Sequence, residues 1–263
     1  MVQEACAPRQ TRALYNTYEG NPSGRQLSET VAEFLSRLPP LTTQLMTSGP
    51  WVFIGNPHTN HRHTNEDIRG FKTTGRELLD EFAANKAEIE TSMAGKAKGI
   101  ITRQITLLRQ KLESDIRAAA QENGCTTGKW MLFPAPDRVN SAWSLVATAT
   151  ANDELGIAAK VATDDGTPDK SRLICIYTED FQNKADVKRV LAKLHAMGLC
   201  NKKGAIGGGQ GIFYKADAYS HLDIMGGNEW GLKPSLYSSR DLLAEEGTET
   251  ERKDVVMKDA WVL

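Results

Sequence analysis

The spacing of apolar residues divides the chain into helical and extended segments. Recurrence every three or four residues predicts amphipathic helices at 27–38, 75–94, 97–121, 141–151 and 185–197. Short apolar runs closed by turn residues predict strands at 50–57, 129–133, 156–162, 173–178 and 212–215. The helix at 97–121 is the clearest of these elements, since it carries an unbroken apolar stripe and ends at Asn123-Gly124.

The order of these elements predicts the fold class. The turn at 163–171, rich in Asp, Gly and Pro, joins two strands into an antiparallel hairpin. Strands and helices do not alternate as regular βαβ units, and the sequence has no internal repeat. We therefore predict an α+β fold, an antiparallel sheet with helices packed on one face.

Polar segments at both ends set the predicted domain boundaries. Residues 1–25 are polar and rich in turn formers, and we interpret them as a flexible N-terminal tail. Residues 26–243 form a single predicted domain. Residues 244–263 are acidic and poor in apolar groups, which predicts a second tail.

Composition excludes several classes of protein. The 263 residues include 32 Lys and Arg against 33 Asp and Glu, so a broadly basic surface that coats nucleic acid is not expected. No apolar run approaches the roughly 20 residues of a membrane helix, and the first ten residues lack the pattern of a signal peptide. Four widely spaced cysteines without a CxxC pair predict reduced thiols, as in a cytoplasmic or nuclear protein.

Three motifs resemble functional sites but have simpler interpretations. The histidines His58, His61 and His63 lie in a polar loop without acidic or cysteine ligands, which favours a solvated loop over a metal site. The Gly-rich stretch 204–211 precedes a strand and lacks the GK[ST] of a phosphate loop, so we interpret it as a flexible connection. Cys175, in an apolar strand, is expected to be a buried, inert thiol. No metal or cofactor is predicted.

Cations near aromatic residues are the strongest candidates for a binding site. Lys160 interrupts a strand of small apolar residues, and alternation places it on the same face of the predicted sheet as Tyr177 of the next strand. Lys215 and Arg240 are further cations beside tyrosines. Such a group suits an anionic ligand such as a phosphate, because Lys and Arg supply charge-assisted donors. Scattered surface cations on a solvated sheet face would give the same pattern.

Several motifs resemble known families. The strand GKWML at 128–132, the helix around Trp143 and the strand ICIYT at 174–178 are similar to the fold of translation initiation factor 4E, which binds the messenger RNA cap. In that resemblance Lys129 matches the Arg of a Gly-Arg-Trp strand, and Tyr177 matches a Trp near the methyl group of the cap. The two tryptophans that sandwich the cap have no counterpart, so the resemblance implies the curved 4E-like sheet rather than ordinary cap binding.

A closer resemblance covers residues 128–243. The motifs LGIAAKVAT, DVKRVLAKL, YKADAYSHL and WGLKPSLYSSRDL resemble the uncharacterised basophilic-leukaemia-expressed protein family, for which the resemblance implies the same 4E-like fold. The order of Lys129, Lys160, Tyr177 and Arg240 also resembles bacterial phosphothreonine lyases, which act by β-elimination. There Lys160 would be the base, but Met131 stands where those enzymes carry a histidine.

Three classes of function remain. The first is a non-catalytic binding module for a phosphate-bearing ligand such as a nucleotide, RNA or a phosphopeptide. Its predicted ligand-binding residues are Lys129, Lys160, Tyr177, Lys215 and Arg240. The second is a phosphothreonine-lyase-like enzyme, and the third is a scaffold that binds a protein partner through its helical face.

Overall fold

The structure is a computed structural model of the chain and describes residues 13–59, 66–200, 205–206 and 211–245. The helices are α1 (Val31–Arg37), α2 (Leu45–Ser48), α3 (Ile68–Ser92), α4 (Lys98–Glu122), α5 (Pro136–Ala151), α6 (Lys184–Ala196) and α7 (Asp217–His221). The strands are β1 (Trp51–Gly55), β2 (Gly128–Leu132), β3 (Ala158–Ala162), β4 (Ile174–Thr178), β5 (Phe213–Ala216) and β6 (Tyr237–Ser238).

The six strands form one antiparallel sheet in the order β1-β3-β4-β2-β5-β6. The predicted hairpin is present, with β3 paired to β4 and Lys160 opposite Cys175. Other neighbours in the sheet are far apart in sequence, since β1 pairs with β3 and β2 lies between β4 and β5. The predicted α+β class is confirmed.

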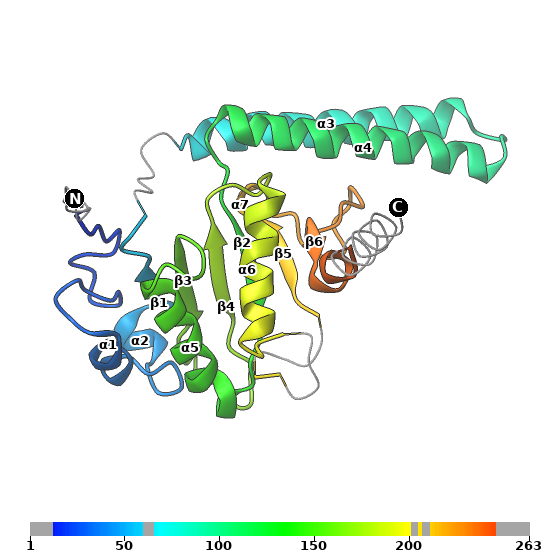
Figure 1. Ribbon diagram of the computed structural model, residues 1–263. Helices are drawn as coiled ribbons and strands as arrows, with labels where there is room; N and C mark the ends of the chain where they lie inside the picture. The colour runs from blue at the N-terminus through cyan, green and yellow to red at the C-terminus, as the bar shows by residue number, and fades with distance from the viewer. Residues whose placement is uncertain (1–12, 60–65, 201–204, 207–210, 246–263) are drawn as a thin grey trace, which may run out of the picture.

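Helices α5 and α6 cover one face of the sheet, as Figure 1 shows. The core lies between them and the strands, because alternate residues of β1, β2 and β3 are buried on that side. Trp130 and Trp143 are fully buried there, and the Trp130 indole N–H donates to the Val187 carbonyl at 3.1 Å. Both tryptophans are therefore structural, as their apolar surroundings in the sequence indicate.

The long helices α3 and α4 form an antiparallel hairpin that crosses one end of the sheet and extends beyond it (Figure 1). Helix α3 begins at Ile68, seven residues before the predicted start, because the Asp67 carboxylate accepts the Gly70 N–H at 2.8 Å and caps it. The hairpin is tied to the domain where Arg109 Nε donates to the Trp230 carbonyl at 2.9 Å. Helix α5 also begins earlier than predicted, with Pro136 in its first turn.

The structure shortens the predicted N-terminal tail. Arg25 N–H donates to the Phe53 carbonyl at 3.0 Å, and Phe53 N–H donates to the Ser23 carbonyl at 2.9 Å. The Tyr18 ring stacks on the Phe53 ring with centroids 4.9 Å apart. β1 is an edge strand with unpaired backbone groups, and the segment before residue 25 satisfies them.

Two further boundaries differ from the sequence prediction. Helix α1 begins at Val31 instead of residue 27, because the side chain of Thr30 caps it in a reciprocal capping box with Glu33. At the other end Glu245, placed in the predicted acidic tail, pairs with Lys184 at 2.9 Å on α6. Residues 246–263 lie outside the described part of the chain.

Candidate functional site

The register of the sheet gathers the predicted cations on the face that α5 and α6 leave open. One row across the strands runs from Tyr177 through Lys129 to Lys215. The next row runs from Lys160 through Cys175 and Met131 toward β5. The three lysines predicted to bind the ligand thus come from three different strands and share one surface.

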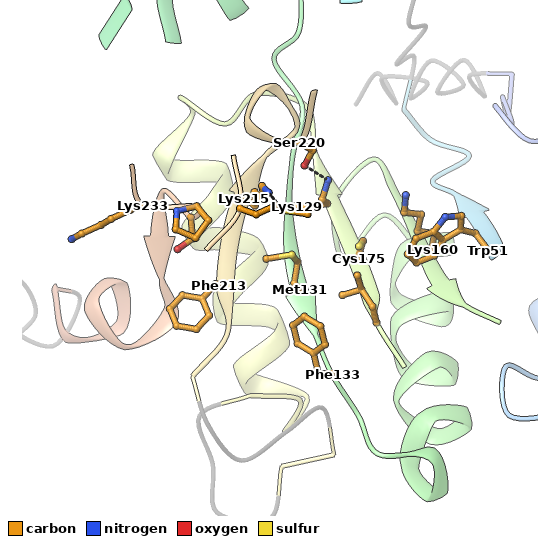
Figure 2. A pocket seen from close by; sticks show the side chains of 14 residues that line it. Trp51, Lys129, Met131, Phe133, Lys160, Cys175, Phe213, Lys215, Ser220 and Lys233 are labelled. Atoms are coloured by element: carbon orange, nitrogen blue, oxygen red, sulfur yellow. Dashed lines mark hydrogen bonds between the residues drawn. The ribbon is translucent and has the colours of Figure 1, made fainter. Parts of the chain in front are cut away.

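Apart from Tyr177, the residues of these rows line the floor of a cavity of about 630 Å³ (Figure 2). A volume of this size lies within the range of small-molecule sites. The lining residues are Trp51, Lys129, Met131, Phe133, Lys160, Leu173, Cys175, Phe213, Lys215, Ser220, Met225, Lys233, Pro234 and Ser235. The cavity is therefore largely apolar, with four lysines in its walls.

Lys160 is held between two aromatic rings. Its Nζ lies 4.2 Å from the centroid of the Trp51 ring and 5.5 Å from that of Tyr177, within the range of cation–π contacts. In the described part of the chain, neither a hydrogen bond nor an ion pair to this ammonium group is found. Burial lowers the pKa of Lys160, and the charge of Lys129 lowers it further. Lys160 thus presents a partly desolvated charge that lacks a counter-ion.

Lys129, by contrast, already has an anionic partner. Its Nζ forms an ion pair with the Asp217 carboxylate and lies 3.3 Å from Ser220 Oγ, and both residues belong to α7. Thr127 Oγ1 donates to the other carboxylate oxygen of Asp217 at 2.7 Å. The start of α7 is therefore joined to β2, and the charge of Lys129 is compensated.

Lys215 is buried beside these groups. Its Nζ donates to the Ile224 carbonyl at 2.9 Å and lies 3.2 Å from Met225 Sδ. Burial lowers its pKa, and the charge of Lys129 acts in the same direction. An ammonium group has three donors, so Lys215 keeps donor capacity for a ligand in the cavity.

Tyr177 and Cys175 provide packing rather than reactive groups. Burial raises the pKa of Tyr177 well above its usual value, so the hydroxyl stays protonated. Burial also raises the pKa of the Cys175 thiol, to about 11. The expectation that the Cys175 thiol is buried is confirmed, and the thiol lies in the cavity floor.

Arg240 does not join the other cations, which corrects the prediction that groups it with them. β6 is only two residues long, and the chain turns into a helical segment at Ser239, so Arg240 leaves the sheet and is exposed. Its side-chain stem lies over Gly211, away from the residues that line the cavity. Because β6 ends before Arg240, the alternation of side chains along a strand does not predict which way Arg240 points.

Sequence reasoning missed several residues of the site, above all Asp217, Trp51 and Lys233. Alternation along β1 places Trp51 and Phe53 on one face, and this signal could have directed Trp51 toward the cations. Asp217 follows Lys215 by two residues, but only the pairing of β2 with β5 brings it to Lys129.

The lyase interpretation requires a histidine as the proton donor of the elimination. Within the described residues no histidine lines the cavity, and Met131 occupies the floor where a lyase-like site requires one. His221 contacts Phe71 edge-on, with ring centroids 6.4 Å apart, and His195 lies in the last turn of α6. The described lining residues therefore include no histidine that could serve as the acid of the lyase interpretation.

Other predicted motifs lie partly outside the described residues. This applies to His61 and His63 and to most of the Gly-rich stretch 204–211. Among the residues that the structure describes, no cluster of three or more potential metal-ligating side chains is present. None of the described helices is long and apolar enough to cross a membrane.

Comparison with models of protein families identifies the family of this chain. The model of the family described as basophilic leukemia-expressed protein Bles03 matches residues 2–223. The matched residues include strands β1 to β5, and with them Lys129, Lys160 and Lys215 of the cavity. The chain therefore belongs to the Bles03 family.

Proposed function

We propose that this protein is a non-catalytic binding module for a phosphate-bearing ligand, a class that includes nucleotides and RNA ends. The observation that carries the proposal is Lys160, a partly desolvated ammonium group in a cavity wall without a counter-ion among the described residues. Lys215, with donor capacity left, lies in the neighbouring row. A phosphate group bound at Lys160 would supply the negative charge that this ammonium group lacks.

Physical chemistry supports an anion here. Hydrogen bonds to charged groups contribute about 1.5–3 kcal/mol each, and a partly desolvated site screens them less than bulk water does. The Trp51 and Tyr177 rings hold the Lys160 ammonium in place before a ligand arrives, which reduces the ordering cost of binding. The residues proposed to bind the ligand are Lys129, Lys160, Tyr177 and Lys215.

A thermal-shift screen tests the proposal. The purified protein is heated with inorganic phosphate, nucleotides, cap analogues, short RNA and a phosphothreonine peptide. A ligand at 100 times its Kd stabilises by about 2.7 kcal/mol, which should raise the Tm by several degrees at roughly 2–4 °C per kcal/mol. Trp51 lines the cavity, so its fluorescence provides a second signal.

Two variants make the screen specific. Lys160→Met keeps the length of the side chain and removes its charge, so the shift should disappear. Lys98→Met removes an exposed charge at the start of α4 and should leave the shift unchanged. The proposal is wrong if no phosphate-bearing compound shifts the Tm, or if the shift survives in Lys160→Met.

A further inference from the structure

We propose that the ligand of this cavity is a single-chain amphipathic anion, a phosphate monoester carried on an aliphatic chain, rather than a nucleotide. This inference rests on the proposed function and narrows it. The observation behind it is the separation of charge and apolar surface within one cavity.

Two of the four cavity lysines, Lys129 and Lys215, lie at one end of the cavity. Lys129 and Lys215 occupy the row that ends beside α7, and the Lys129 ammonium points toward Ser220 in Figure 2. Lys160 lies one row further, on the side of β1. An anionic headgroup suits this end of the floor, since Lys129 and Lys215 stand opposite each other on neighbouring strands there.

The rest of the floor is apolar. Met131 and Phe133 continue along β2 away from Lys129, and Leu173 precedes β4 on the same side. Because alternate residues of a strand face the same way, these side chains form a continuous surface that leads away from the charged end. A chain attached to the headgroup would lie along it.

The rim carries apolar side chains that are unusually exposed. Phe133 is 51% exposed, Phe213 is 50% exposed and Met225 is 60% exposed, and all three line the same cavity. Single exposed apolar residues are common, but a group of them around one hollow marks a binding surface. Methionine adapts its shape to flexible apolar partners, which suits a chain of variable length.

The polar groups needed by a nucleobase are scarce. Among the 14 lining residues of the described chain there is no Asp, Glu, Asn or Gln side chain. A base placed on this floor would leave amino and ring N–H groups without these acceptors, and each unsatisfied group weakens binding by roughly 10- to 100-fold. An aliphatic body has no such groups to satisfy.

Alkyl phosphates of increasing length test the inference. Binding of methyl, hexyl, octyl and decyl phosphate is measured by isothermal titration calorimetry, each below its micelle concentration, beside AMP and the neutral detergent decyl maltoside. Affinity should rise by up to about fourfold per added methylene group until the chain fills the cavity. Decyl phosphate should bind at least tenfold more tightly than AMP, methyl phosphate or decyl maltoside.

Two variants separate the ends of the cavity. Lys160→Met should weaken every phosphate by a similar factor. Met131→Gln keeps the volume of a floor residue but makes it polar, so it should weaken decyl phosphate at least tenfold and leave methyl phosphate unchanged. Leu107→Gln, on an exposed face of the helical hairpin, is the matched control and should change neither.

The outcomes distinguish this inference from the function on which it rests. AMP binding as tightly as decyl phosphate, or affinity independent of chain length, overturns the inference and leaves a phosphate-binding module. Equal binding of decyl maltoside and decyl phosphate overturns it too, because the cationic end would then contribute nothing. Failure of every phosphate to bind removes the proposed function as well.

Discussion

Replacing Asp217 by Asn should destabilise the fold while it strengthens binding of anions. The Asp217 carboxylate is 15% exposed and the Lys129 side chain 12% exposed, so the ion pair is mostly shielded from water. Removing one partner of a fully buried pair costs about 3–5 kcal/mol, and the residual exposure reduces this to about 2–3 kcal/mol. At roughly 2–4 °C per kcal/mol, the Tm should fall by about 4–12 °C.

The gain in binding has the same origin. Without Asp217 the Lys129 ammonium loses its internal counter-ion, and the cavity carries one more uncompensated positive charge near the phosphate position. One additional charge-assisted hydrogen bond, worth about 1.5–3 kcal/mol, corresponds to a roughly 10- to 150-fold lower Kd. Stability and affinity should therefore change in opposite directions.

A double-mutant cycle measures the first effect. The free energy of unfolding is obtained from urea denaturation, followed by circular dichroism, for the wild type, Asp217→Asn, Lys129→Met and the double variant. Coupling of at least 1 kcal/mol between the two positions is expected, since they contact each other directly. Additive effects, or an Asp217→Asn variant that is as stable as the wild type, would show that the ion pair does not hold α7 on the sheet.

Three further predictions concern the same region. Lys160→Met should be more stable than the wild type at pH 7, and the difference should shrink as the pH rises toward 10. The reason is that burial lowers the pKa of Lys160 in the folded state, so keeping this side chain charged reduces the stability of the wild type at neutral pH. Deprotonation of Lys160 at higher pH removes this cost. Melting curves of both proteins from pH 6 to 10 measure the difference. In a background with Cys6→Ser, Cys125→Ala and Cys200→Ala, the Cys175 thiol, with its pKa raised to about 11, should react with a disulfide reagent at pH 8 only after denaturant is added. Fast labelling of that native variant would contradict the burial of Cys175. Tyr18→Ala removes the ring stacked on Phe53 and should lower the free energy of unfolding by about 1–3 kcal/mol, whereas an unchanged urea midpoint would mean that the N-terminal segment contributes nothing to the edge of the sheet.

Local structure followed closely from the sequence where the pattern of apolar residues is strong. Helix α4 was predicted to within one residue at each end, and the β3–β4 hairpin was predicted with its turn, because both depend on side chains close together in the chain. The starts of α3 and α5 were missed. Helix α3 begins with the Asp67 cap and a glycine in its first turn, and α5 begins with Pro136 followed by two charged residues, so a start is harder to predict there from periodicity.

The sequence by itself determined which residues face which side of each strand. Period-two alternation is a local property, and it correctly placed Lys160 and Tyr177 on one face. The resemblance of the motifs also indicated the family that the match over residues 2–223 confirms.

Only the tertiary structure decided which strands are neighbours. Placing β2 between β4 and β5 brings Lys129, Lys215 and Asp217 together from positions about 90 residues apart in the chain, and the same pairing leaves Arg240 outside. The edge position of β1 likewise recruits a polar N-terminal segment that has no apolar pattern of its own. Strand order and edge pairing depend on contacts between segments that are distant in the chain. The local pattern of side chains does not predict which of these contacts form.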